Sequence, residues 1–255
     1  MTRVLLFGST QVSGRIVYNF LKSRLNVVGA VLEDRPSRIG MAKRRAARLG
    51  LKTVFGQVAF ILTVPRLLRR VSEQRVEEIR DAFDLDFTPI PKNATWQVDS
   101  INSDHVLDVV CEVRPDVIVV CGTRIISRRV IEHAACPMIN IHVGITPKYR
   151  GIHGGYWALF NRDRENFGTT IHLIDEGIDT GTVLRQVRVV PSKEDNFATY
   201  PLLQLAHALE PLYEEILRCS EDNSAPIQPD AQGVSDLYYH PTLLQYLKGR
   251  VKGVK

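Results

Sequence analysis

Two residues near the middle of the chain, Asn140 and His142, have types and a spacing that could do chemistry. They lie in the stretch NIHVGITPKYRG, residues 140–151. On a β-strand, residues two apart point to the same face, so the amide and the imidazole would lie side by side. An imidazole exchanges protons near neutral pH, and an amide can donate a hydrogen bond to a developing oxyanion. A nearby carboxylate would complete the set by fixing the imidazole tautomer.

The surrounding sequence supplies strands that would position this pair. PMINIH, residues 137–142, is typical of a strand with the pair at its carboxyl end, and DVIVV, residues 116–120, is typical of a buried neighbouring strand. In open α/β sheets ligands bind beyond the carboxyl ends of the strands. The loop DEGIDTG, residues 175–181, follows the predicted strand TTIHLI and would bring Asp175 or Asp179 to the same edge.

The N-terminal segment predicts the fold class. Residues 4–7 form a short apolar run, residues 9–21 indicate a loop and a helix, and residues 26–32 a second strand. This alternation is typical of an α/β fold with a Rossmann-like, doubly wound, mostly parallel sheet. We predict a catalytic domain over residues 1–218, a helical insertion at about 41–83, and a C-terminal arm with short strands over 219–255.

The composition indicates an ordinary globular protein. The chain has 255 residues, of which 44% are hydrophobic and 24% charged, and its net charge is +5. Such a mild positive charge favours anionic substrates without requiring nucleic acid. Four scattered cysteines show neither a disulfide framework nor a zinc pattern, so we expect a cytoplasmic protein. We find no signal peptide and no apolar stretch that we expect to span a bilayer.

The insertion combines basic and apolar residues. Residues 41–70 contain eight Lys or Arg and no Asp or Glu, and TVFGQVAFILTVPRLL is strongly apolar. We favour a helical insertion whose apolar residues pack on the core, with Pro65 interrupting the helix. Contact with an anionic membrane surface is an alternative. A third is that Lys43, Arg44 and Arg45 flank a diphosphate.

The motifs carry a family resemblance. N-x-H, then KYRG, then GIDTG in this order and spacing resembles the 10-formyltetrahydrofolate-dependent formyltransferases. The resemblance implies the formyltransferase fold and a catalytic set of Asn140, His142 and Asp179, with Asp175 as the weaker acid. An amine would attack the formyl carbon, while Asn140 and protonated His142 hold the oxyanion. Asp179 would stabilise the imidazolium and order a water that relays the proton of the amine.

The resemblance also places the co-substrate, 10-formyltetrahydrofolate. Arg124, Ile125 and Ile126 would form one wall of its pocket, and Gly177 and Ile178 would close the other side. For Ile125 and Ile126, an ordinary role in the core is an equal alternative.

The loop after the predicted strand is expected to meet the acceptor. Lys148, Tyr149 and Arg150 are the predicted substrate-binding residues. His153 is a further candidate for substrate contact, whereas we interpret His172 as a structural histidine. Because the histidines lie on separate segments without cysteines, no metal site is predicted.

Four kinds of enzyme within the resemblance differ in their acceptor. Methionyl-tRNA formyltransferases have a C-terminal barrel for which residues 219–255 are too few. Glycinamide ribonucleotide formyltransferases lack such a basic insertion, and formyltetrahydrofolate deformylases carry an N-terminal regulatory domain. Sugar-amine N-formyltransferases, which act on nucleotide-linked amino sugars, fit best, with a short arm and a helix like Tyr156-Trp157-Ala158-Leu159.

We therefore predict a folate-dependent transferase of one-carbon metabolism that acts in surface polysaccharide synthesis, such as that of lipopolysaccharide O-antigen. The expected partner is a nucleotide sugar. Homodimerisation and peripheral membrane contact are further expectations that the sequence leaves open. The alternatives are a glycinamide ribonucleotide or other small-amine formyltransferase, and a non-catalytic folate-binding module.

Overall fold

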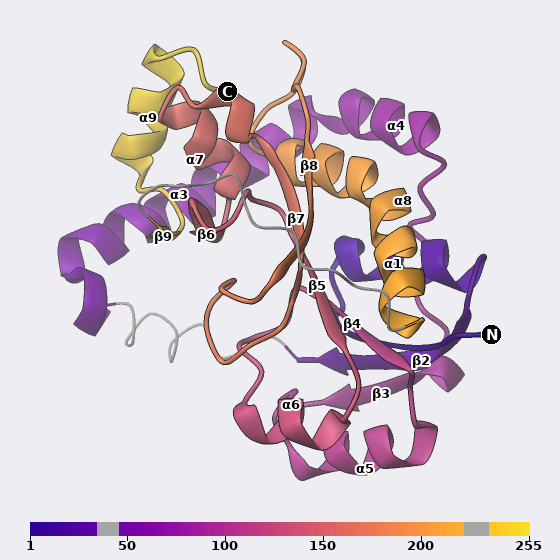
Figure 1. Cartoon of the computed structure of the whole chain (residues 1–255). Coiled ribbons are helices and arrows are strands. Elements are labelled where there is room, and N and C mark those ends of the chain that lie inside the picture. Colours follow the sequence, from indigo (N-terminus) through magenta and orange to yellow (C-terminus); the bar gives the residue numbers. More distant parts are fainter. Residues whose placement is uncertain (35–45, 222–234) are drawn as a thin grey trace.

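The predicted doubly wound α/β fold is confirmed in a computed structural model, which describes residues 1–34, 46–221 and 235–255. A seven-stranded sheet with the order β3-β2-β1-β4-β5-β7-β8 forms the centre (Figure 1). The strands are β1 Arg3–Ser9, β2 Asn26–Glu33, β3 Thr95–Val98, β4 Val117–Cys121, β5 Met138–His142, β6 Tyr149–Gly151, β7 Gly168–Leu173, β8 Val183–Arg188 and β9 Asp236–Tyr238. The helices are α1 Val12–Lys22, α3 Leu51–Val71, α4 Glu73–Ala82, α5 Asp104–Val113, α6 Arg128–Ala134, α7 Gly154–Phe160, α8 Tyr200–Ser220 and α9 Leu243–Val251, with short 3-10 turns at Lys92–Ala94 and Arg164–Asn166.

The sheet is parallel from β3 to β5 and antiparallel beyond it. β5 pairs in parallel with β4 and antiparallel with β7, which pairs antiparallel with β8. In the antiparallel ladder Asn140 lies directly opposite His172, and His142 opposite Thr170. This register brings a second histidine beside the predicted pair.

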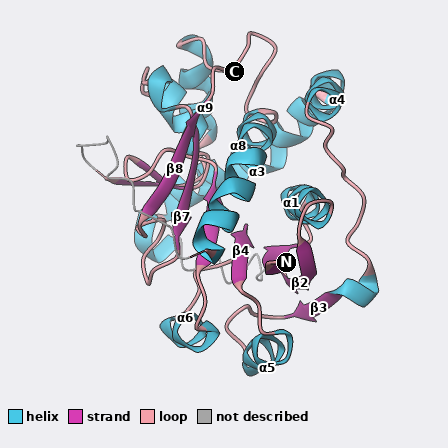
Figure 2. Cartoon of the chain, turned by 45° about the vertical axis from the view of Figure 1, so that its right-hand side comes forward, coloured by secondary structure: helices cyan, strands magenta, loops and turns pink. Residues whose placement is uncertain are grey.

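Helices cover both faces of the sheet. α1 and α8 lie on one face and α5 and α6 on the other, as Figure 2 shows. Alternate residues of the strands serve the two layers: Val4 and Leu6 pack with the first pair of helices, and Leu5 and Phe7 with the second. Because the strands are buried on both faces, they are continuous apolar runs in the sequence.

The insertion departs from the prediction. We expected Pro65 to interrupt the helix, but α3 continues through Pro65 to Val71. Proline has no backbone N–H, so the helix lacks one hydrogen-bond donor at Pro65. Two nearby side chains donate to backbone carbonyls in the same stretch of the helix. Thr63 Oγ1 donates to the Ala59 carbonyl at 2.7 Å, and Arg66 Nη1 donates to the Leu62 carbonyl at 2.8 Å. The uninterrupted helix is long and apolar enough to cross a membrane, which corrects the expectation that no such stretch exists.

The expected burial of the insertion is also only partly correct. α3 buries Gln57, Phe60 and Val64, whereas Leu51 and Phe55 are each 78% exposed. Among the described residues, one side of the helix packs on the rest of the fold and the opposite side is exposed. Lys43, Arg44 and Arg45 lie outside the described residues.

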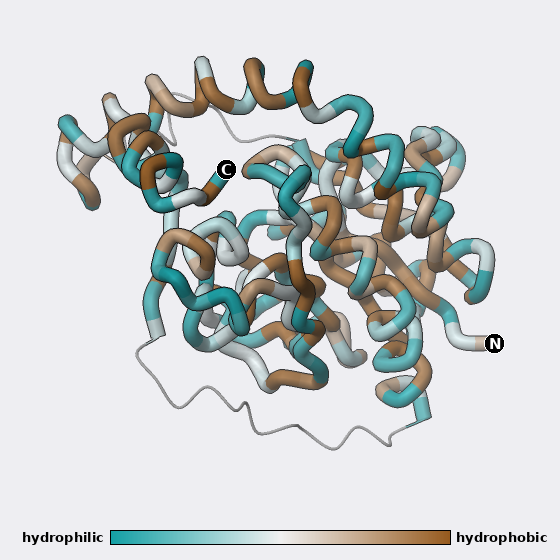
Figure 3. The backbone as a smooth tube through the Cα atoms, turned by 90° about the horizontal axis from the view of Figure 1, so that it is seen from above, coloured by the Kyte–Doolittle hydropathy of each residue, from teal (hydrophilic) through white to brown (hydrophobic). Residues whose placement is uncertain are grey.

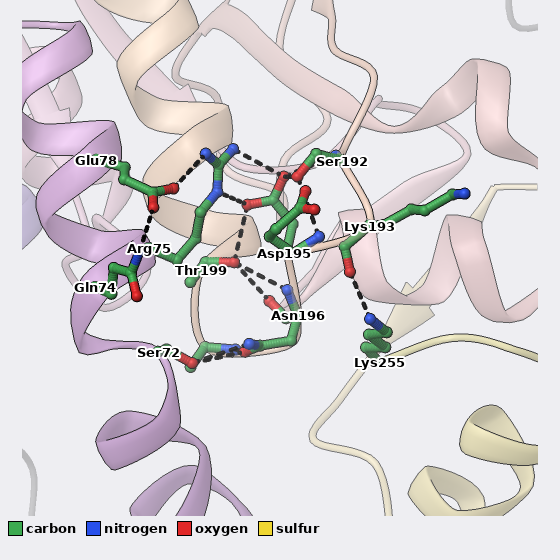
Figure 4. Close-up of polar contacts among 12 residues, drawn as sticks. Ser72, Gln74, Arg75, Glu78, Ser192, Lys193, Asp195, Asn196, Thr199 and Lys255 are labelled. Atoms are coloured by element: carbon green, nitrogen blue, oxygen red, sulfur yellow. Dashed lines mark hydrogen bonds and ion pairs between the residues drawn. The ribbon is translucent and has the colours of Figure 1, made fainter.

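Helix α4 is fixed to the core by a buried polar network. Arg75 makes two hydrogen bonds to the carboxylate of Asp195, at 2.9 Å and 3.2 Å, and Asn196 Nδ2 donates to Ser72 Oγ at 2.9 Å (Figure 4). Asp195 is buried, and Thr199, just before α8, donates to its Oδ1 at 3.2 Å. The network holds α4 against the N-terminus of α8.

The C-terminal arm contains a short strand, as expected, and a helix that was not predicted. β9 pairs in parallel with β6, and α9 begins with a capping box in which Thr242 and Gln245 bond each other's backbone N–H groups. Gln57 of α3 donates to the carbonyl of His240 at 2.8 Å. The arm and the insertion therefore support each other.

Candidate active site

Asn140 and His142 lie at the carboxyl end of β5, as the sequence predicts. The ring of His142 is buried, and its Nε2 lies 3.1 Å from the carbonyl oxygen of Tyr149. Because a carbonyl only accepts, Nε2 carries the proton in the neutral ring. Nδ1 is then the unprotonated atom, and it faces Asp179 Oδ1 at 3.4 Å. A proton that arrives at Nδ1 would lie between the ring and a carboxylate.

The loop DEGIDTG places Asp179 at this point. Asp179 has a positive φ of 51°, in the left-handed region that Asp adopts more readily than most residues. The glycines keep the loop tight, since a Cβ on Gly177 or Gly181 would lie 1.8 Å from another atom. The backbone N–H of Gly151 donates to Asp179 Oδ2 at 2.8 Å, which fixes the carboxylate.

Asp175, the weaker candidate, has a different position. Its carboxylate accepts hydrogen bonds from Thr180 Oγ1 at 2.8 Å and from the N–H of Gly177 at 3.0 Å. These contacts close the loop that carries Asp179. Asp175 is exposed and orders the loop, while Asp179 faces His142.

His172, which the sequence analysis interpreted as a structural histidine, contacts the amide of Asn140, a contact that the sequence analysis did not predict. Its Nδ1 lies 2.8 Å from the Leu173 carbonyl, so Nδ1 carries the proton and Nε2 accepts. Asn140 Nδ2 lies 2.9 Å from that Nε2 and donates to it. The tautomer of His172 therefore decides which way the amide of Asn140 points. The sequence signal was the position of His172 on the strand that leads into the acidic loop.

The pKa values of His142 and Asp179 are shifted by burial and by the charges near them. Burial lowers the pKa of His142, and the nearby charge of Asp179 only partly opposes this. Burial alone would raise the pKa of Asp179, but the positive charge of His142, the nearby ring of His172 and the hydrogen bond from the N–H of Gly151 bring it down to about 2. At pH 7 these directions leave Asp179 charged and His142 neutral.

The residues expected to contact the folate differ in exposure. Ile125, after β4, is 53% exposed, whereas Ile126 is buried in the core with Val130 and other apolar residues. Of the two isoleucines, Ile125 presents apolar surface to a ligand. The guanidinium of Arg124 pairs with the buried carboxylate of Glu33 and donates to the Asp99 carbonyl at 2.8 Å.

On the other side of the site, the loop residues Gly177 and Ile178 lie beside the basic turn. Arg150 Nη1 donates to the Ile178 carbonyl at 3.2 Å. Lys148 and Tyr149 both bind Asp163, through Nζ at 2.6 Å and the hydroxyl at 2.8 Å. Tyr149 is buried, so its contribution to the site is its backbone carbonyl, which holds His142.

A second polar feature lies at the end of β1. Ser9 is 6% exposed, and its Oγ has no hydrogen-bond partner among the residues that the structure describes. Helix α1 begins just beyond it without a side-chain cap and without an acidic residue in its first turn. Free N–H groups at a helix N-terminus attract anions. β1 lies two strands from β5 in the sheet, roughly 10 Å away because neighbouring strands are about 4.8 Å apart.

The fold and the site together define a class of enzyme. In this class, an α/β sheet carries an Asn, a His and an Asp at its carboxyl edge. The formyl transferase family model matches residues 3–201. The chain belongs to the formyl transferase family, as the sequence motifs predicted.

The matched relatives are named as formyltransferases that act on different acceptors. A methionyl-tRNA formyltransferase of Chlorobium chlorochromatii is 32% identical over 135 residues, which cover 52% of this chain and 42% of the relative. The phosphoribosylglycinamide formyltransferase of Escherichia coli is 37% identical over 102 residues, covering 38% and 47%. The aligned regions thus span less than half the length of these relatives.

Solved structures show the same fold. A sugar N-formyltransferase from Shewanella matches with a TM-score of 0.57 and 15% identity, covering 98% of this chain and 87% of its own. A phosphoribosylglycinamide formyltransferase from Streptococcus pneumoniae matches with a TM-score of 0.53 and 18% identity, covering 86% and 98%. At these identities the likeness concerns the fold.

Proposed function

We propose that this chain transfers the formyl group of 10-formyltetrahydrofolate to the amine of a small, phosphate-bearing acceptor. The observation that carries the proposal is the arrangement of Asn140, His142 and Asp179, in which a neutral imidazole faces a carboxylate beside an oriented amide. This set suits direct attack by an amine, because it offers a base and an oxyanion donor without a covalent nucleophile.

In this mechanism His142 acts as the base. The amine nitrogen attacks the formyl carbon, and its proton passes to Nδ1 of the neutral imidazole, directly or through a water held by Asp179. The imidazolium that forms is stabilised by the carboxylate 3.4 Å away. It then gives its proton to the folate nitrogen as the bond between that nitrogen and the formyl carbon breaks, so tetrahydrofolate leaves and the imidazole is neutral again. This revises the expected resting state, because burial lowers the pKa of His142 and the ring becomes charged only during the reaction.

Asn140 is proposed to stabilise the negative charge that develops on the formyl oxygen. Its amide nitrogen has two N–H bonds, and one of them donates to His172. We propose that the other bonds the oxygen of the formyl group as negative charge develops on it. A donor of this kind contributes on the order of a hundredfold or more to the rate.

The co-substrate supplies the activated formyl group when it binds, and the chain offers residues that fit it. Ile125 presents exposed apolar surface at the carboxyl edge of the sheet. Gly177 and Ile178 lie in the loop that carries Asp179, and this supports the proposal that they close the pocket toward the reacting group. We assign the wall to Arg124 and Ile125, with the Arg124 guanidinium held by Glu33.

The acceptor is proposed to carry phosphate. We propose that the uncapped N-terminus of α1 is an anion site at the same edge as Asn140 and His142, next to the buried Ser9 hydroxyl, which has no partner among the described residues. A nucleotide-linked amino sugar is the acceptor that we favour, supported by the match of a sugar N-formyltransferase over 98% of this chain. Glycinamide ribonucleotide is the second candidate, since it is also an amine with a phosphate.

The test is a panel of acceptors. The purified chain is incubated with 10-formyltetrahydrofolate and, separately, nucleotide-linked amino sugars, glycinamide ribonucleotide and methionyl-tRNA, while folate turnover is followed by absorbance. We expect turnover with one of the two small acceptors, and a raised KM with little change in kcat for Ser9→Val. Turnover with methionyl-tRNA alone would overturn the assignment of a small acceptor.

A further inference from the structure

One side of helix α3 carries an apolar stripe that faces solvent. The stripe repeats at helical spacing over three turns. Its members are Leu51, Phe55, Val58 and Leu62, which are 78%, 78%, 41% and 45% exposed. At 3.6 residues per turn these positions lie opposite the buried face of the helix. In Figure 3 the long helix at the top of the view lies at the periphery of the chain, with hydrophobic colour recurring along it.

The charges of α3 are all of one sign. Leu51–Val71 contains Lys52, Arg66, Arg69 and Arg70 and no Asp or Glu. Arg66 and Arg69 follow Leu62 by four and seven residues, so they continue the line of the stripe. An exposed apolar stripe that ends in unopposed cations complements a surface that is apolar inside and anionic outside.

The packed side of α3 holds the helix on the fold. Phe60 is fully buried, with its ring centre 5.0 Å from that of Phe197 and 5.5 Å from that of Tyr246. Gln57 donates to the His240 carbonyl at 2.8 Å. A helix that left the fold to cross a bilayer would lose these contacts, so its geometry suits a position in the plane of the interface.

The neighbouring helix has the same character. Leu244, Leu247 and Val251 of α9 are exposed at a spacing of three and four residues, and Lys248 lies among them. α9 begins directly against α3, since a Cβ on Gly56 would lie 2.9 Å from Thr242 (Figure 1). Two adjacent helices therefore expose apolar residues together with cations.

We propose that the α3 stripe docks this protein on an anionic lipid bilayer as a peripheral, in-plane contact. A second copy of the chain fits the same face less well. Pairing this face with itself would bring together the cations of both copies without a carboxylate from either α3. This inference does not depend on the proposed catalytic function.

The experiment is co-sedimentation of the full chain with vesicles. Vesicles of phosphatidylcholine with phosphatidylglycerol are compared with pure phosphatidylcholine, at low and at high salt. We expect binding to the anionic vesicles that high salt releases, because exposed charges are screened. Phe55→Ser should weaken the partition coefficient about tenfold. Arg69→Gln should weaken it about fivefold, equal to about 1 kcal/mol.

Matched controls use exposed residues away from α3. Val190→Ser removes an equally exposed apolar side chain, and Lys22→Gln removes an exposed cation of α1. Both should bind vesicles like the wild type. The proposal is overturned if the chain does not sediment with anionic vesicles at low salt, or if Phe55→Ser binds as well as Val190→Ser. A dimer in solution that Phe55→Ser dissociates, without vesicle binding, would assign the stripe to a second copy instead.

Discussion

Replacing Asp179 by Asn isolates the charge that faces His142. The substitution keeps the shape of the side chain, and its amide oxygen can still accept the hydrogen bond from the N–H of Gly151, now 2.8 Å long. The amide nitrogen then faces His142 Nδ1. Its N–H can donate a hydrogen bond to Nδ1 only when the ring is neutral and Nδ1 carries no proton. The variant should therefore fold with a neutral His142 and fail to stabilise the imidazolium.

The expected loss follows from the distance. Two full charges 3.4 Å apart interact by about 5 kcal/mol at an effective dielectric constant of about 20. If about half of the charge has developed on the ring in the transition state, about 2.5 kcal/mol is lost, and kcat falls on the order of a hundredfold. KM for the folate should change little, because the interaction is made only as the reaction proceeds.

The assay is single-turnover formyl transfer to the acceptor identified by the panel, followed by absorbance. Asp175→Asn is the matched control, since it makes the same change in the same loop, where the carboxylate binds Thr180 and Gly177. That variant should retain most of its activity. If Asp179→Asn turned over like the wild type, or if both variants lost activity equally, the assignment of Asp179 as the partner of His142 would be wrong.

Four further predictions concern the site and its support. Asn140→Ala should lower kcat more than it raises KM, as the oxyanion role requires; steady-state kinetics that show a change in KM alone would contradict it. In the wild type, kcat/KM should rise with pH through a pKa below 6.5 and stay flat above it, because burial lowers the pKa of His142 and the neutral ring is the base. A profile that falls as pH rises through this window would refute the role of His142 as the base. His172→Phe should lower kcat about tenfold with unchanged folding, since the amide of Asn140 loses its acceptor; equal kcat would remove the positioning role. Arg75→Met should lower the free energy of unfolding, measured by urea denaturation, by about 3 kcal/mol, because Asp195 stays buried without its partner. Since the pKa of Asp195 is lowered in the folded protein, the stabilisation by the Arg75–Asp195 pair is present above about pH 4 and is lost as pH falls. A variant as stable as the wild type at pH 7 would count against this prediction.

The sheet and the proximity of Asn140, His142 and Asp179 were predictable because their signals are local. Buried parallel strands are continuous apolar runs, and the alternation of strand and helix restricts the topology to a few choices. The strand parity of Asn140 and His142 placed both on one face. The tight loop with its glycines brought an acid to the same edge.

Other features depend on contacts between distant segments. The contact between His172 and Asn140 requires the antiparallel register of β5 and β7, in which the two residues lie opposite each other, and no local pattern gives that register. The exposure of Leu51 and Phe55 depends on where the arm packs, because α9 covers only one side of α3. An apolar run in a helix does not by itself say which of its faces is buried.

We propose that the chain transfers a formyl group and that His142 and its partners carry out the transfer. The most direct measurement supplies 10-formyltetrahydrofolate with an isotopically labelled formyl carbon and quantifies tetrahydrofolate, labelled acceptor and labelled formate. Wild type should give equal amounts of tetrahydrofolate and labelled acceptor, and folded His142→Ala should give neither. Labelled formate in place of labelled acceptor, or equal transfer by the His142→Ala variant, would contradict the account.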